Sequence, residues 1–170
     1  MKTKILALVA IAAMSLTCAC SDDETEETLT EKCQKGDAEA CLIGMWQMQS
    51  IQDAGADYAI VADFRDGPGR LVINEDGSFT YTYATSPSSL MVNDCGGLDD
   101  SGKWTYDNAT KTLSLKFTVG EQCNPSPTAS AIVSVNTAEL TLSGHVFQSS
   151  EDVSSSAQLV EYFRRIAILQ

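Results

Sequence analysis

The sequence predicts an all-β protein, an eight-stranded antiparallel up-and-down barrel, and three observations lead to this prediction. Apolar and polar residues alternate with a period of two in most segments after Gly44, as in strands with one solvated face. These segments are rich in aromatic and β-branched residues. Short and long connections alternate between them, which an up-and-down barrel explains and a Greek-key sandwich does not.

The alternation is clearest where aromatic residues recur. Phe79, Tyr81 and Tyr83 share one face of a strand, and Trp104 and Tyr106 share one face of another. The predicted strands are 44–53, 70–74, 78–84, 102–107, 112–119, 129–136, 139–143 and 158–167. The last of these is also compatible with a helix. Residues 58–64 are either a short helix or an additional strand, and residues 90–93 are a possible edge strand.

The connections predict how the barrel is oriented. Consecutive connections of a meander fall at opposite ends of the sheet, so the tight turns should share one end with the start of the first strand. The long loops should then share the other end, where we expect any binding site, because function concentrates on long loops carried by a rigid scaffold. The tight turns are 75–77, 108–111 and 137–138, and the long loops are 54–69, 85–101, 120–128 and 144–157.

The first 19 residues have the pattern of an export signal. A basic head, residues 1–4, precedes the uncharged residues 5–16, a run too short to span a bilayer as a helix. The run ends in Leu16-Thr17-Cys18-Ala19-Cys20, which resembles the lipobox of bacterial lipoproteins. This resemblance implies cleavage before Cys20 and lipid attachment to it, on the periplasmic or cell-surface side of the bacterial envelope. The alternative is an ordinary signal peptide that releases a soluble protein.

The charge of the chain limits its partners. It has 170 residues, with 11 basic and 23 acidic side chains and a net charge of −12, which argues against nucleic acid. Residues 21–31 contain six acids and one leucine, so we expect a flexible tether there. The predicted organisation is a signal peptide at 1–19, an acidic tether with a small disulfide loop at 20–41, and a barrel at 42–170.

Four cysteines follow Cys20, and in an exported chain an even number indicates disulfides. Cys33 and Cys41 precede the first strand, at the tight-turn end, whereas Cys95 and Cys123 lie in two long loops. A strand of about eight residues spans roughly 25 Å. A disulfide needs Cα atoms within about 4.4–6.8 Å. We therefore predict the pairs Cys33–Cys41 and Cys95–Cys123.

Four short strings carry a resemblance to a known family. Gly44-Met45-Trp46 opens the first strand, and the later strings are residues 74–79, 102–106 and 161–165. In this order they resemble the lipocalin-like domains of bacterial lipoproteins, over about residues 42–168. The resemblance implies that Arg164 or Arg165 lies against Trp46 at the closed end of the barrel. It also implies a membrane-anchored carrier or sensor of a small hydrophobic molecule.

No set of residues nominates a reaction. His145 is the one histidine, and the acidic residues 94–100 lack the ligand spacing of a known calcium loop. We therefore predict a monomeric protein that is not an enzyme, without metal or cofactor.

The aromatic face is the candidate binding site, with two interpretations. These side chains either fill the barrel or form a cup for a hydrophobic ligand. An empty interior of several hundred cubic ångströms would favour a ligand carrier. A filled interior would favour an interaction module of the cell envelope, which contacts protein or polysaccharide through its long loops. The residues concerned are Phe79, Tyr81, Tyr83, Trp104 and Tyr106.

Overall fold

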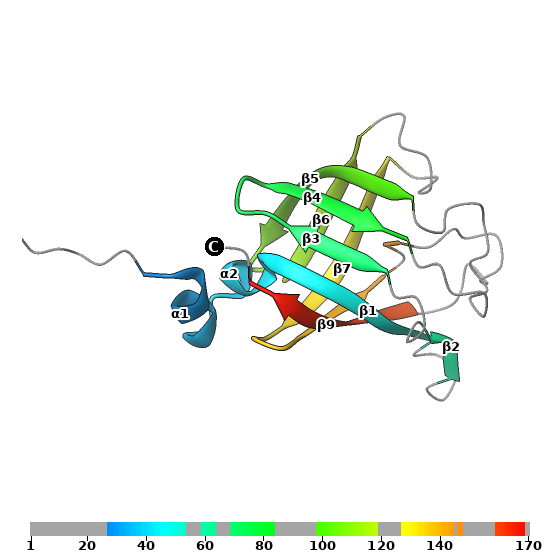
Figure 1. Ribbon diagram of the computed structural model, residues 1–170, viewed down its shortest axis with the longest axis horizontal. Helices are drawn as coiled ribbons and strands as arrows, with labels where there is room; N and C mark the ends of the chain where they lie inside the picture. Colours follow the sequence, from blue (N-terminus) through cyan, green and yellow to red (C-terminus); the bar gives the residue numbers. More distant parts are fainter. Residues whose placement is uncertain are drawn as a thin grey trace, which may run out of the picture.

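The computed structural model describes residues 27–53, 59–63, 69–83, 98–118, 127–144, 146–147 and 159–168. The strands of this part are β1 (Gly44–Asp53), β2 (Ala59–Asp63), β3 (Arg70–Ile73), β4 (Ser78–Thr82), β5 (Asp99–Asp107), β6 (Thr112–Phe117), β7 (Thr128–Val135), β8 (Glu139–Ser143) and β9 (Leu159–Ala167). They form one antiparallel sheet in the order β2-β1-β3-β4-β5-β6-β7-β8-β9, and β1 also pairs with β9. That pairing closes β1 and β3–β9 into an eight-stranded barrel (Figure 1).

The predicted up-and-down barrel is confirmed, and two open questions are settled. Residues 59–63 form the additional strand β2, which pairs with the second half of β1. The segment compatible with a helix is the strand β9, which pairs with both β1 and β8. Leu159, Glu161 and Phe163 are buried on its inner face, as the period of two requires. The possible edge strand at 90–93 lies outside the described residues.

The tight turns share one end of the barrel with the start of β1, as predicted. Gly44 pairs with Ile73, next to the turn that joins β3 to β4. The turns are built by side chains that accept backbone N–H groups: Asp76 accepts from Ser78 at 2.8 Å, and Asn136 accepts from Glu139 at 2.8 Å. We call this end the closed end and the opposite half of the barrel the far half.

Two short helices lie at the closed end, α1 (Leu29–Gln34) and α2 (Ala38–Leu42) (Figure 1). The expectation of a flexible tether through residue 31 is therefore wrong for residues 29–31. Thr28 and Glu31 form a capping box, in which the Thr28 hydroxyl accepts from the Glu31 N–H at 3.3 Å and the Glu31 carboxylate accepts from the Thr28 N–H at 2.9 Å. This cap stabilises the start of α1 in a segment whose acidic composition predicts a flexible chain.

The disulfide Cys33–Cys41 is confirmed, with Cα atoms 4.6 Å apart. It joins α1 to α2 and keeps both helices together at the entrance to β1. Cys20, Cys95 and Cys123 lie outside the described residues, so the lipid attachment and the second disulfide stay predictions.

Candidate functional site

An arginine and a tryptophan close the barrel at the start of β1. Trp46 is fully buried, and its indole Nε1 donates to the carbonyl oxygen of Leu42 at 2.8 Å. The guanidinium carbon of Arg165 lies 4.1 Å from the centroid of the Trp46 ring. Arg164, the other candidate for this position, is exposed. The contact places a partly buried cation on a buried indole face, which is worth more than the same pair fully in water.

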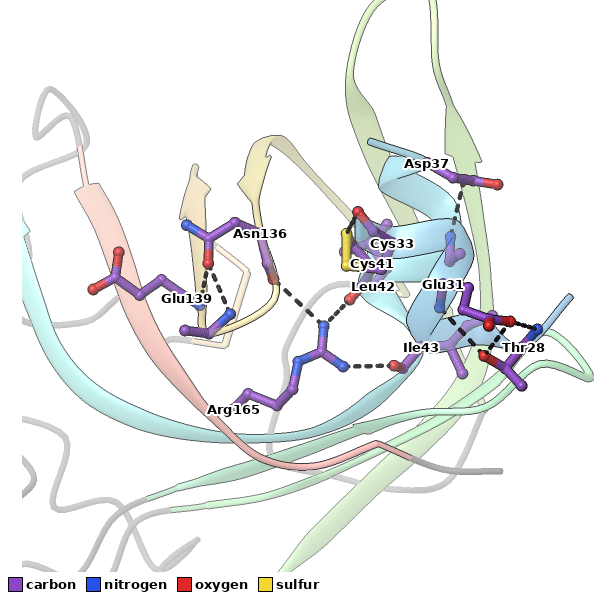
Figure 2. Close-up of a disulfide and its surroundings, with 12 residues drawn as sticks. Thr28, Glu31, Cys33, Asp37, Cys41, Leu42, Ile43, Asn136, Glu139 and Arg165 are labelled. Atoms are coloured by element: carbon purple, nitrogen blue, oxygen red, sulfur yellow. Dashed lines mark hydrogen bonds between the residues drawn. A yellow bond between two sulfur atoms is a disulfide. The ribbon is translucent and has the colours of Figure 1, made fainter. Parts of the chain in front are cut away.

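The guanidinium of Arg165 also ties three chain segments together (Figure 2). Its Nη1 donates to the carbonyl oxygen of Ile43 at 3.0 Å, and its Nη2 donates to the carbonyl oxygens of Cys41 and Asn136. These carbonyls belong to the end of α2, to the entrance of β1 and to the turn between β7 and β8. A planar fork of donors suits this task, and the result is a rigid closed end.

The surroundings of Gly44 explain why a glycine is needed two residues before Trp46. Its φ is +147°, and a Cβ there would lie 2.8 Å from both the Nη1 of Arg165 and the carbonyl oxygen of Ala167. A side chain at this position would therefore push the arginine away from Trp46. The Gly44, Trp46 and Arg165 positions act together to close the barrel, which is a structural role.

The five predicted aromatic residues do not line a single space. Trp104 lies at the closed end, where its Nε1 donates to the carbonyl oxygen of Asn74 at 2.9 Å. Tyr106 is only partly buried against the core. Phe79 is buried and meets Phe117 edge to face, with ring centroids 5.3 Å apart. Tyr81 and Tyr83 lie further along, in the far half.

Phe147 fills the far half of the interior, although it belongs to no strand. It is fully buried and stacks on Tyr81, with ring centroids 3.9 Å apart and planes inclined by 15°. Its ring also meets Phe117 and Phe163 edge to face, at 6.4 and 6.3 Å. The described interior is therefore packed from Trp46 to Phe147, which matches the interpretation in which the aromatic side chains fill the barrel.

A buried carboxyl lies beside this aromatic stack. The Glu161 side chain is fully buried, and its Oε1 accepts from the backbone N–H groups of Phe147 at 3.0 Å and of Val146 at 3.3 Å. Its Oε2 has no hydrogen-bond partner among the described residues. Burial raises the pKa of Glu161 from 4.5 to about 8, and the two N–H groups oppose that rise.

A second carboxyl and two tyrosines complete this polar cluster. Asp100 is buried, and the hydroxyl of Tyr83 donates to it at 2.8 Å. The hydroxyl of Tyr81 donates to the sulfur of Met48 at 3.6 Å. Burial raises the pKa of Tyr81 well above its ordinary value, and the Glu161 charge adds to the rise. Burial, followed by the hydrogen bond to Asp100, does the same for Tyr83.

Gly69 lets the Tyr81 hydroxyl reach this position. A Cβ on Gly69 would collide with the hydroxyl, so the close approach of backbone to ring requires a glycine. We call Tyr81, Tyr83, Asp100, Phe147 and Glu161 the far-half cluster. No group of three or more metal-ligating side chains occurs among the described residues, so this cluster is not arranged as a metal site.

Sequence reasoning found two members of the far-half cluster and missed three. Tyr81 and Tyr83 belong to the predicted aromatic face, whereas Asp100 falls in the predicted long loop 85–101, and this prediction is wrong for residues 99–101 because β5 begins at Asp99. Glu161 could have been found from parity, because it shares the inward position with Leu159 and Phe163 on β9. Nothing in the sequence pattern marks Phe147, since it lies in a connection without periodicity.

Two hollows lie on the outer surface. One, of about 560 Å³, lies over β5, β6 and β7 and is lined mainly by polar side chains such as Lys103, Ser114 and Lys116. The other, of about 350 Å³, lies between α1 and the β3–β4 turn. Neither opens into the far-half cluster.

A closed eight-stranded antiparallel meander with a buried Gly-x-Trp and an arginine on that indole defines the class of lipocalin-like β-barrels. The family model described as a lipocalin-like domain matches residues 42–142, which is more than half of the chain. The chain belongs to this family. None of the curated proteins compared with it matches.

Three crystal structures from Bacteroides are similar to this chain. A lipocalin-like protein from Bacteroides uniformis is 16% identical, covers 73% of this chain and 97% of its own, and gives a TM-score of 0.47. An uncharacterized protein from Bacteroides eggerthii is 13% identical, with coverage of 72% and 98% and a TM-score of 0.44. A duf4847 family protein from Bacteroides vulgatus is 15% identical, with coverage of 76% and 96% and a TM-score of 0.44.

Proposed function

We propose that this protein binds a small, largely apolar ligand in the far half of its barrel, in the space that Phe147 occupies. The observation that carries the proposal is the position of Phe147. A residue outside the strands stacks at 3.9 Å on an interior tyrosine, beside a buried carboxyl whose second oxygen has no partner in the described part of the chain. A buried polar group in an apolar interior is typical of ligand sites.

The energies make exchange of Phe147 for a ligand feasible. Moving a buried Phe side chain into water costs about 1.5–3 kcal/mol, and losing an aromatic stack costs about 0.5–1.5 kcal/mol more. Each buried methylene of a ligand returns about 0.8 kcal/mol. A ligand with eight or more apolar carbons would therefore offset the loss. The closed end offers no such exchange. Trp46 belongs to the strand β1, and its hydrogen-bond partner Leu42 belongs to the helix α2.

The proposed setting is the bacterial envelope, with a lipid on Cys20 after removal of residues 1–19. Support comes from the closed end, where residues 29–42 enter β1. A chain tethered there would hold the far half away from the membrane. Among the described residues, no helix is long and apolar enough to cross a bilayer. The same proposal includes a monomeric protein with a binding rather than a catalytic role.

The test of ligand binding uses the neutral fluorescent probe N-phenyl-1-naphthylamine, titrated into the mature chain. We expect saturable binding of the probe to the wild type. Phe147→Ala should bind the probe at least about tenfold more tightly than the wild type, because the competing side chain is gone. Ile132→Ala is the matched control: Ile132 is 53% exposed, and its removal should leave the affinity unchanged.

Two results would overturn the proposal. One is the absence of saturable binding to both the wild type and Phe147→Ala. The other is a loss of probe binding in Ile132→Ala, which would place the probe on the outer surface. Either result would favour the alternative, an interaction module with a filled barrel that contacts protein or polysaccharide.

A further inference from the structure

We propose that the far-half cluster selects ligands with a cationic amine, which pairs with the Oε2 of Glu161 while the apolar part of the ligand replaces the Phe147 ring. This inference rests on the proposed function and names the chemical class of its ligand.

The charge of the interior is the first argument. In the described part of the chain, the buried charged side chains are Asp100 and Glu161, and both are acidic. The described residues that pair with Glu161, Ile51 on β1 and Leu142 on β8, are apolar and supply no positive charge. The titratable groups that interact with Glu161 are Tyr81 on β4 and Tyr83, the second residue after Tyr81. Tyr83 in turn donates to Asp100 on β5. A buried carboxyl without a counter-ion is costly, and a ligand cation would supply one.

The hydrogen bonds of Glu161 decide which of its oxygens is available. Both backbone N–H groups, from Val146 and Phe147, donate to Oε1. Oε2 is buried and has no partner among the described residues, so it is the position where a donor is missing. An ammonium group carries three donors and no acceptor, which matches an oxygen that lacks a donor.

The aromatic rings supply the rest of the selectivity. Tyr81 and Tyr83 meet edge to face at 4.9 Å, and Tyr81 presents a ring face that Phe147 now covers. A cation near a desolvated aromatic face is stabilised by the negative electrostatic potential of the ring. The net charge of −12 also raises the local concentration of cations over that of anions. An alkyl or aryl amine combines the two features that the cluster requires.

The test compares three ligands of equal length, octylamine, octanol and octanoate, as competitors of N-phenyl-1-naphthylamine on the full mature chain near pH 8.5. At this pH octylamine is still protonated, because alkyl ammonium groups ionise near the pKa of lysine, about 10.4. We expect octylamine to compete at least about tenfold better than octanol, and octanoate to compete worst. In Glu161→Gln the preference for the amine should fall below about twofold, with octanol unchanged.

Glu139→Gln is the matched control, because it removes the same charge from an exposed position on the neighbouring strand β8 and should keep the preference. Below pH 7 octylamine binding should release a proton, measured by calorimetry in buffers of different ionisation enthalpy, and Glu161→Gln should abolish the release. Equal competition by all three ligands would overturn the amine selectivity and leave the binding site standing. Retention of the preference in Glu161→Gln would overturn the role of Glu161. Failure of all three ligands to compete would overturn the binding site and, with it, this inference.

Discussion

The two ends of the barrel interior differ in how their charged side chains are held. At the closed end, Arg165 donates through Nη1 and Nη2 to three carbonyl oxygens and covers Trp46, whose Nε1 has its own acceptor; only the buried Nε of Arg165 lacks a partner among the described residues. In the far half, Glu161 keeps an oxygen without a partner among the described residues, and a residue outside the strands fills the space beside it. The closed end has the features of a structural closure, and the far half has those of a site whose contents can change.

The largest expected effect lies at the closed end. Trp46→Ala should lower the free energy of unfolding by about 3–5 kcal/mol, because a fully buried indole leaves a cavity and an unpaired carbonyl. Urea denaturation of both proteins measures the difference. Phe147→Ala should cost less, because Phe147 lies outside the strands that form the barrel wall. An equal loss in the two variants would remove the contrast between the ends.

The second prediction concerns pH and the far half. Burial raises the pKa of Glu161 to about 8 from 4.5, so the folded state holds this proton more tightly than the unfolded state does. The stability contributed by the protonated carboxyl is therefore present at low pH and is lost as pH rises from 4.5 to about 8. Glu161→Gln cannot ionise, so above this range it should be more stable than the wild type by up to about 5 kcal/mol, at about 1.36 kcal/mol for each unit of pKa.

Urea denaturation over a pH series gives the free energy of unfolding of the wild type and of Glu161→Gln. The difference between these two curves measures the effect. Glu139→Gln, with its exposed carboxyl, should run parallel to the wild type. Parallel curves for Glu161→Gln as well would show that Glu161 is not buried as the structure has it.

The disulfide at the closed end should contribute somewhat less to the free energy of unfolding than Trp46 does. Replacing both Cys33 and Cys41 by Ala should lower the free energy of unfolding by about 2–3 kcal/mol, the loop-closure entropy of a short loop. Thermal unfolding of the oxidised proteins measures it. The far half should be unaffected, so the affinity for N-phenyl-1-naphthylamine should match that of the wild type. A parallel loss of affinity would link the two ends and contradict their separate roles.

The smallest expected effect tests the geometry of the arginine. Arg165→Lys keeps the charge but cannot reach several carbonyls with a planar fork, so we expect a loss of about 1–2 kcal/mol. Arg164→Lys is the control on an exposed neighbour and should stay within about 0.5 kcal/mol of the wild type. Equal stabilities of the two variants would show that the carbonyl contacts contribute little.

More of the closed end than of the far half can be predicted from the sequence, for physical reasons. The period of two and the tight turns are local, so they predict the strands, the meander and the end at which Trp46 lies. Cys33 and Cys41 are close in sequence, and their pairing follows from strand length alone. The helix at 29–34 was missed because its capping box, Thr28 and Glu31, lies within a run of acids that favours disorder by composition.

The far half depends on contacts between residues distant in sequence. Glu161 meets Val146 and Phe147 only because β9 pairs with β8 and these two residues are buried beside it. Asp100 lies in an acidic string, yet the pairing of Asp100 with Tyr81 turns it inward. Composition assigns such residues to the surface, and only the closed sheet shows that they are buried.

The most direct test of a site in the far half is an NMR titration of the chain labelled at its methionine methyl groups. Met48 lies next to the Tyr81 hydroxyl, whereas Met45 lies at the closed end, opposite Ala167. Adding octanol should move Phe147 off Tyr81 and shift the Met48 methyl signal through the changed ring currents, while the Met45 signal stays in place. An unmoved Met48 signal at saturating octanol, or equal shifts of both signals, would contradict the account.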